Sequence, residues 1–142
     1  MINISKDIYD EMVVHVKGGY PNECCGALLG KVAKDEAGTK SVDQAHALTN
    51  INEERSADRY EIDPLELLKV EKEASKNGLV VVGFYHSHPD HPDEPSGFDR
   101  ERAWPDYSYV IIAVEGGVNI KTRSWTFTEM EAPFEAEEMN II

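Results

Sequence analysis

The chain has 142 residues, of which 41% are hydrophobic and 29% are charged. A chain of this size and composition can bury enough apolar surface to fold without stabilising disulfide bonds or metal ions. We therefore expect one domain over residues 1–142. The formal net charge of −13 argues against nucleic acid or an anionic membrane as the main partner, because both require a positive protein surface. The same charge is compatible with a basic partner or with a salt-adapted host proteome.

The two cysteines and the N-terminus bear on the cellular compartment. Cys24 and Cys25 are adjacent, unlike the spaced cysteines of a secreted disulfide framework. No apolar run approaches the length of a transmembrane helix, and residues 1–12 do not resemble a signal peptide. We therefore expect a cytoplasmic protein.

In chain order, the periodicity of hydrophobic residues predicts helices and strands, and Gly, Pro and Asp mark the turns between them. The predicted helices cover residues 5–17, 64–77 and 96–103. The predicted strands cover residues 25–32, 42–49, 60–62, 79–85, 107–114 and 118–128. Ser5 and Asp63 are suited to cap the first two helices, and Pro64 suits the first position of the second.

These elements predict an α/β domain with a central mixed sheet, because the hairpin formed by residues 25–32 and 42–49 forces antiparallel pairing. The strand at residues 79–85 is apolar on both faces, which is typical of a central strand covered on both sides. Residues 50–59 are polar and predict a loop. The acidic tail, residues 129–142, is expected either to add a strand or to wrap the sheet.

The segment after the central strand carries a candidate metal site. His86 and His88 are two residues apart, so in extended backbone their side chains point to the same face. Asp99 follows 11 positions after His88 and supplies a carboxylate within reach. Three protein ligands with an open fourth position are the arrangement of a catalytic zinc site.

Two other histidine motifs fit this segment less well. The run from His86 to His91 also reads HxHxDH, as in the metallo-β-lactamase superfamily, but that superfamily needs a further histidine downstream and no histidine follows His91. An amidohydrolase barrel also begins with HxH, yet a barrel of that type takes roughly 250 residues. His91 itself is read as a solvated loop residue.

Ser96 and Asp99 admit two interpretations. Their spacing is that of a capping box at the start of a helix, which is a purely structural feature. Beside His86 and His88, the same spacing also suits a metal ligand in the first helical turn. Both interpretations can hold together, with Ser96 capping the helix and Asp99 binding the metal.

The motif as a whole resembles that of the JAMM, or MPN+, zinc metalloproteases. Their pattern is an upstream Glu followed by HxHPx(6)SxxD, which is matched here by Glu23 and by the segment from His86 to Asp99. The sequence around Glu23 and that of residues 60–64 resemble the corresponding sequences of compact prokaryotic members. The resemblance covers residues 5–127 and implies the JAB/MPN fold, which is similar to that of the cytidine deaminases.

The resemblance also implies roles for individual residues. His86, His88 and Asp99 would bind Zn²⁺, whose fourth position holds a water. Glu23 would move the proton of that water to the leaving amine, and Ser96 would hydrogen-bond the oxyanion. Without the resemblance, Glu23 is one of 27 acidic residues with no distinguishing pattern.

The implied function is a zinc-dependent peptidase or isopeptidase. In the family, the substrates are the C-terminal tails of ubiquitin-like proteins, and compact prokaryotic members resemble enzymes that act on sulfur-carrier proteins. Such a tail would bind as an added strand, with residues 50–59 or the region of Tyr60 as candidate edges. A non-catalytic interaction module and a zinc hydrolase of small amides are the alternatives.

The remaining cysteine, histidine and aromatic side chains are given structural roles. Cys25 is expected to be a small buried residue, and His15 and His46 to lie on the surface or in a satisfied core. The larger aromatic residues are expected in the core or on a sheet face. They are Trp104, Tyr107, Tyr109 and Trp125.

Overall fold

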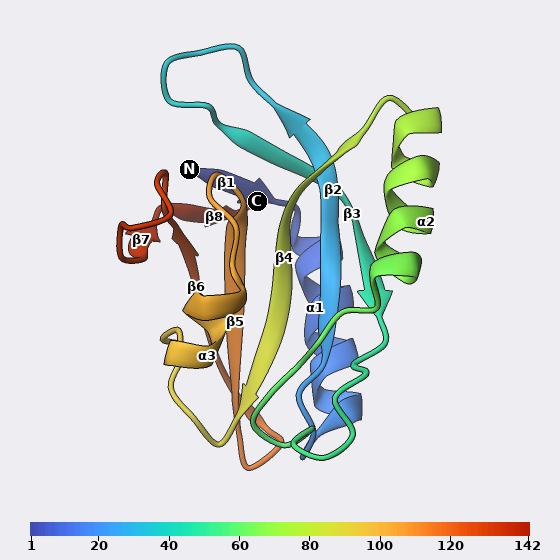
Figure 1. The fold of residues 1–142 in the computed structure, drawn as a ribbon, viewed down its shortest axis with the longest axis vertical. Coiled ribbons are helices and arrows are strands. Elements are labelled where there is room, and N and C mark those ends of the chain that lie inside the picture. The colour runs from blue at the N-terminus through green and yellow to red at the C-terminus, as the bar shows by residue number, and fades with distance from the viewer.

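The computed structural model describes residues 1–142 as one eight-stranded sheet with three helices (Figure 1). The helices are α1 (Lys6–Gly19), α2 (Pro64–Lys76) and α3 (Gly97–Arg102). The strands are β1 (Ile2–Ile4), β2 (Cys25–Val32), β3 (Lys40–Leu48), β4 (Val80–Pro89), β5 (Ser108–Glu115), β6 (Asn119–Thr126), β7 (Glu135–Glu137) and β8 (Met139–Ile141). The α/β class with a mixed sheet, expected from the sequence, is confirmed.

The sheet has the order β7-β6-β5-β4-β2-β3-β1-β8. The β2–β3 hairpin is antiparallel, as predicted, whereas β4 runs parallel to β5. β4 therefore has a hydrogen-bonded neighbour on each side, β2 and β5. This central position explains why its sequence is apolar on both faces.

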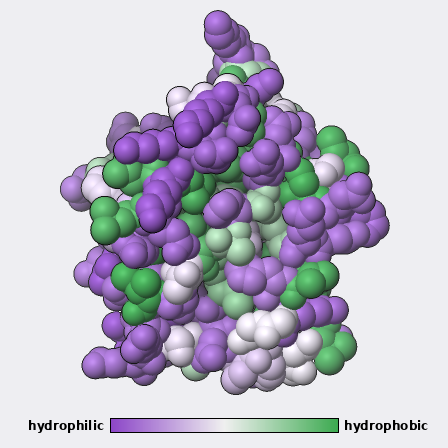
Figure 2. Space-filling model, turned by 90° about the vertical axis from the view of Figure 1, so that its right-hand side faces the viewer, coloured by the Kyte–Doolittle hydropathy of each residue, from purple (hydrophilic) through white to green (hydrophobic).

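The helices α1 and α2 cover opposite faces of the sheet (Figure 1). Met12 and Val16 of α1 are buried in one hydrophobic cluster, and Val70 and Ala74 of α2 are buried in the other. Both helices bury a stripe of residues four positions apart, which is the pattern of an amphipathic helix packed on a sheet. Figure 2 shows that the face carrying α2 is mostly hydrophilic, with scattered hydrophobic side chains.

Alternation along β4 decides which way the candidate ligands point. Phe84 belongs to the cluster under α2, whereas Tyr85 belongs to the cluster under α1 and its hydroxyl bonds Nδ1 of His15 at 2.7 Å. His86 and His88 share the face of Phe84 because side chains alternate with a period of two. The two histidines therefore lie on the face of the sheet opposite α1.

No helix is both long enough and apolar enough to cross a membrane.

Several element boundaries differ from the predictions. α1 continues through Gly18 and Gly19, which were expected to end it, and its C-cap is Tyr20. β4 extends to Pro89, so His86 and His88 lie within the strand rather than after its end. β3 begins at Lys40, two residues early, because β1 pairs with its first three residues.

The predicted strand at residues 60–62 is wrong. Only Ile62 pairs, in a single bridge to Asn50, and residues 51–61 form no strand. The prediction of a loop at residues 50–59 is confirmed, so the suggested strand edges at Tyr60 and at 50–59 do not exist. Hydrogen bonds from side chains, rather than a ladder, hold this segment.

The chain termini form strands that are too short for periodicity to reveal. β1 is a three-residue strand that lies between β3 and β8 and pairs with both in parallel. Of the two alternatives for the acidic tail, the added strand is confirmed, since β7 and β8 both join the sheet. The expected position of Trp104 in the core or on a sheet face is wrong, because the residue is 63% exposed and lies between α3 and β5.

Gly83 allows β4 and β5 to approach each other, and its replacement should destabilise the fold. A Cβ at Gly83 would lie 2.2 Å from the carbonyl oxygen of Ser108, its register partner on β5. Because that contact is with backbone, relief requires the strands to move. We expect Gly83→Ala to lower the free energy of unfolding by about 1–3 kcal/mol or more, measured by denaturant unfolding.

Gly18 in α1 provides the matched control, because a Cβ there would meet nothing within 4 Å. Gly18→Ala should be neutral or raise the free energy of unfolding by roughly 0.5–1 kcal/mol, since alanine favours the helix. Equal stability of the two variants would show that β4 and β5 have room for the added methyl group.

Candidate metal centre

His86 and His88 are held on the most buried part of the sheet. Their side chains are 1% and 7% exposed, respectively. β5 pairs with both residues along one side of β4, and β2 pairs with His86 along the other. The backbone under the two imidazoles is therefore fixed by the sheet, and their relative position does not depend on a loop.

Asp99 is positioned by the first turn of α3. Ser96 is the N-cap of this helix, and its Oγ accepts a hydrogen bond from the backbone N–H of Asp99 at 3.0 Å. The backbone N–H of Ser96 donates to Oδ2 of Asp99 at 2.9 Å. Both halves of the capping box are thus present, and they aim the Asp99 carboxylate at β4.

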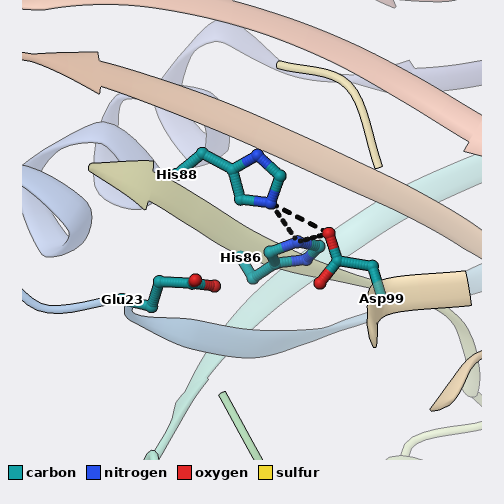
Figure 3. A group of neighbouring side chains, drawn as sticks. All are labelled: Glu23, His86, His88 and Asp99. Atoms are coloured by element: carbon teal, nitrogen blue, oxygen red, sulfur yellow. Dashed lines mark hydrogen bonds and ion pairs between the residues drawn. The ribbon is translucent and has the colours of Figure 1, made fainter. Parts of the chain in front are cut away.

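Three potential ligand atoms meet at one point (Figure 3). Nε2 of His86 lies 3.1 Å from Nε2 of His88, and these atoms lie 3.2 Å and 2.9 Å, respectively, from Oδ2 of Asp99. Ligands at 2.0–2.1 Å from a tetrahedral zinc ion are separated by about 3.3 Å. The spacing of the three atoms is therefore close to three corners of such a site.

The hydrogen bonding of His88 leaves a lone pair directed at this point. Nδ1 of His88 lies 2.7 Å from the carbonyl oxygen of Pro92, which can only accept. Nδ1 therefore carries the hydrogen, and in the neutral imidazole Nε2 presents a lone pair. A lone pair facing the Asp99 carboxylate is repulsive unless a cation lies between them, and either a proton on Nε2 or a metal ion can take this place.

The ring of His86 is oriented by stacking. Tyr60 lies against it with ring centroids 4.4 Å apart and an interplanar angle of 26°. Nδ1 of His86 is buried and has no hydrogen-bond partner within the protein. Because Nδ1 has no partner, packing against Tyr60 holds the ring from the side and helps to fix the direction in which Nε2 points.

Asp99, His86 and His88 shift one another's pKa values. Burial opposes ionisation of Asp99, but the two nearby histidines outweigh it and hold the pKa of Asp99 well below its usual value. Burial lowers the pKa of His86, whereas for His88 the hydrogen bond and charge of Asp99 overcome burial and raise its pKa. An ionised carboxylate between two imidazoles attracts a cation.

Glu23 lies beside the three donors without bonding to them. Its side chain points toward them from the segment before β2 (Figure 3), and a carboxylate oxygen lies within 4.8 Å of each donor atom. The side chain is only 4% exposed, and its Oε1 is buried with no hydrogen-bond partner. Burial raises the pKa of Glu23 to about 8. A buried carboxyl with a free oxygen is suited to holding or passing a proton.

Asn50 fixes the backbone on which Glu23 stands. Its Nδ2 donates to the carbonyl oxygens of Glu23 at 3.1 Å and of Arg59 at 3.0 Å. Its Oδ1 accepts from the backbone N–H groups of Asn52 and Glu61, each at 3.0 Å. Each of the four bonds pairs a donor with an acceptor. Through them, the Asn50 amide joins the backbone of Glu23 to the loop 50–61.

A cavity of about 450 Å³ opens beside the cluster. Glu23 and His88 line its inner end, and Ser96 and Phe98 of the α3 region line one side. The loop that follows β3 forms another side. A cavity of this volume holds a small ligand or the end of a peptide chain.

The chain is similar to known proteins in sequence and in fold. A family model described as "Prokaryotic homologs of the JAB domain" matches residues 5–128. A desampylase of Haloferax volcanii is 34% identical over 133 residues, which cover 90% of each chain. The chain belongs to the prokaryotic JAB-domain family.

Two further relatives support membership of the JAB family. A CysO-cysteine peptidase of Mycobacterium tuberculosis is 31% identical over 127 residues, covering 89% of this chain and 82% of the peptidase. A solution structure of a protein from Desulfitobacterium hafniense has a TM-score of 0.86 and 32% identity, covering all of this chain and 93% of that one. The predicted resemblance to the family is thus confirmed.

The donor set of this JAB domain fits a divalent metal ion. Mg²⁺ and Ca²⁺ prefer oxygen ligands, whereas two imidazole nitrogens with one carboxylate favour a transition metal or zinc. His91, although close in sequence, is exposed and lies outside the cluster of four donors. Cys25 is completely buried, as expected, and is also outside the cluster.

Sequence reasoning missed the residues that support the site. Tyr60, Asn50 and Arg59 all come from the stretch read as a short strand and a polar loop. Tyr60 lies three positions before the helix cap Asp63, and no local pattern marks it as a partner of His86. The four bonds of Asn50 depend on a folded loop and leave no local pattern.

Proposed function

We propose that this protein is a zinc-dependent peptidase or isopeptidase. Its substrate would be a conjugate of a ubiquitin-like or sulfur-carrier protein, cut directly after the C-terminal Gly-Gly. The observation that carries the proposal is the buried cluster of Glu23, His86, His88 and Asp99 at the inner end of a cavity. The desampylase and CysO-cysteine peptidase relatives supply the substrate class.

His86, His88 and Asp99 would hold the metal through Nε2, Nε2 and Oδ2. Zinc held in this way polarises a carbonyl group and lowers the pKa of a bound water to about 7. The protein's own contribution is a rigid donor set on β4 and α3. Two free cysteines, Cys24 and Cys25, suit a reducing compartment, and we include a cytoplasmic location in the proposal.

Glu23 and Ser96 would act on the substrate on either side of the metal site. Glu23 would take a proton from the attacking water and give a proton to the leaving amine, a role for which its buried, unpartnered oxygen is placed. Ser96 is exposed, and because its Oγ already accepts from Asp99 N–H, its own hydrogen is free. That hydrogen can be donated to the oxyanion that forms from the carbonyl oxygen.

The substrate tail would enter without adding a strand to the sheet at residues 50–59, since that segment is not a strand. It would instead lie in the cavity between the loop and α3, where Pro92, Pro95 and Phe98 form part of the wall. Glycines at the end of the tail suit this path, because a side chain beside the cleaved bond would meet Ser96 or Glu23.

The structure also bears on the two alternatives. A non-catalytic interaction module has no use for an unpartnered buried acid, and Glu23 supports the enzyme for that reason. A hydrolase of small amides would use the same residues but would not require a protein tail. The two enzyme hypotheses therefore differ only in the substrate.

The test is cleavage of a Gly-Gly-extended sulfur-carrier protein followed by mass spectrometry. We expect the zinc-loaded enzyme to release the group after Gly-Gly and to lose this activity when the last Gly is replaced by Val. Equal rates for the Gly and Val substrates, or hydrolysis of unrelated small amides alone, would contradict the proposed substrate class.

Asn50 offers a separate test of how Glu23 is positioned. In Asn50→Asp, a carboxylate oxygen would replace Nδ2 and face the carbonyl oxygens of Glu23 and Arg59. We expect kcat to fall about 10- to 100-fold, because small displacements of a reacting group are costly, while zinc content is retained. Asn77→Asp, at the exposed end of α2, is the matched control and should leave both unchanged. Unchanged kcat in Asn50→Asp would show that Glu23 does not depend on this amide.

A further inference from the structure

We propose that Arg59 binds the free α-carboxylate of the leaving group, and that the enzyme therefore prefers adducts in which Gly-Gly is joined to a single amino acid. This inference rests on the proposed function and narrows its substrate class. The alternative class is a conjugate in which Gly-Gly is joined to a lysine side chain of a protein, which has no carboxylate next to the cleaved bond.

Arg59 is the one arginine of the cavity that lacks a carboxylate partner. Two arginines line the cavity, Arg55 and Arg59. Arg55 forms a two-pronged ion pair with Asp58, and the other exposed acid of the wall, Glu94, pairs with Arg123. No ion pair or side-chain hydrogen bond involves the Arg59 guanidinium. In a protein with 27 acidic and 14 basic side chains, a cation left unpaired in a cavity calls for an explanation.

The guanidinium of Arg59 lies over an aromatic ring and forms no hydrogen bond. Its carbon atom lies 4.4 Å from the centre of the Phe98 ring, and Phe98 also lines the cavity. A cation over an aromatic ring is attracted by the electrons of the ring and needs no carboxylate partner, so the N–H groups of Arg59, which bond to no other protein group, remain available. Those groups have the geometry that binds a carboxylate through two parallel hydrogen bonds.

Arg59 lies on the side of the site where the leaving amine must be. Nδ2 of Asn50 donates to the carbonyl oxygens of both Glu23 and Arg59, so the two backbones are joined through one nitrogen atom. The N–H of Glu23 also donates to the carbonyl oxygen of Ser56, in the same loop. Because Glu23 gives its proton to the leaving amine, that amine must lie beside Glu23 and near this loop.

The chemistry of the leaving group completes the placement. Hydrolysis uses one water, whose oxygen bonds to the glycine carbonyl carbon while the C–N bond breaks and a proton passes through Glu23 to the amine. In an amino-acid adduct, the α-carboxylate is separated from that nitrogen by a single carbon atom. A carboxylate so close to the amine falls on the side of the cavity that carries Arg59.

The test compares two substrates that differ only in this charge. Both are a sulfur-carrier protein ending in Gly-Gly-Ala, one with a free C-terminal carboxylate and one with a neutral C-terminal amide. We expect the zinc-loaded wild type to cleave the carboxylate form with kcat/KM about 10-fold or more above the amide, the range of a hydrogen-bonded ion pair. In Arg59→Gln, this ratio should fall toward one, and Arg59→Lys should restore only part of it.

Arg102→Gln is the matched control. Arg102 also lies over the Phe98 ring, at 4.9 Å, but it pairs with Glu61 and does not line the cavity. The ratio should keep its wild-type value in this variant. Wild-type enzyme that cleaves both substrates equally, or a ratio that Arg59→Gln leaves unchanged, would overturn the role of Arg59 alone. Cleavage of a Gly-Gly conjugate on a lysine side chain but of neither Gly-Gly-Ala substrate would also overturn the role of Arg59. Failure of wild type to cleave all three substrates would instead overturn the proposed function.

Discussion

Glu23→Gln is expected to lower kcat by at least about 10²-fold, the contribution of a well-placed general base. Gln has nearly the same shape as Glu and can still hydrogen-bond water, but it cannot take up or release the proton. The variant should fold and keep its zinc, because Glu23 makes no hydrogen bond to His86, His88 or Asp99. The effect should therefore appear in turnover and not in metal content.

The measurement is kcat on a Gly-Gly-extended substrate, together with zinc content and the unfolding midpoint of the same preparation. Glu94→Gln is the matched control, because Glu94 lines the same cavity but is exposed and pairs with Arg123. Its kcat should stay within a few-fold of wild type. Zinc-loaded Glu23→Gln with near-wild-type turnover would show that another group carries the proton.

Replacing any of the three proposed ligands should remove the metal and, with it, the activity. In Asp99→Asn, the carboxylate charge between the two imidazoles is lost while the size of the side chain is kept. In His86→Ala and His88→Ala, the donor nitrogen is lost. We expect zinc content to fall from about one ion per chain to a small fraction of that, and turnover to fall to background.

The metal content of each purified variant decides this prediction, and thermal unfolding gives an independent measure. A bound ion stabilises the folded state, so zinc should raise the unfolding midpoint of wild type and not that of the ligand variants. His91→Ala is the matched control: it removes an exposed histidine of the same loop and should keep its zinc. A ligand variant that retains a full equivalent of zinc does not lack a ligand.

The pairing of His86 with His88 could be predicted from the sequence because it depends only on the period of a strand. A spacing of two residues fixes a common face once the segment is extended, and the apolar run before His86 indicates a strand. The length of β4 was less predictable. It continues to Pro89 because β5 pairs with it in parallel along this whole stretch, a tertiary effect with no local signal.

The position of Asp99 was predictable for a different reason. The capping box read from Ser96 and Asp99 is a local motif, and it forms as expected. That the same carboxylate also reaches both imidazoles depends on the path of the loop before α3. The sequence permitted both interpretations of this pair, and the geometry brings both together in one side chain.

The roles of Glu23 and of Asn50, which holds its backbone, could not be predicted from sequence patterns alone. Glu23 is one of many acids, and its place beside the donors follows from the pairing of β2 with β4, where Cys25 lies opposite His86. One hydrogen bond of Asn50 reaches Glu23, 27 positions away, and the others lie within the irregular loop, so no periodicity indicates them. Glu23 was identified through the family resemblance, and Asn50 and Arg59 only through the structure.

The most direct measurement is a titration of metal-stripped protein with zinc, following release of the group after Gly-Gly by mass spectrometry. If His86, His88 and Asp99 hold one catalytic ion, the rate should rise in proportion to added zinc and level off at about one equivalent per chain. Full activity in the stripped protein, or a rate that does not respond to zinc, would contradict a metal-dependent peptidase at this site.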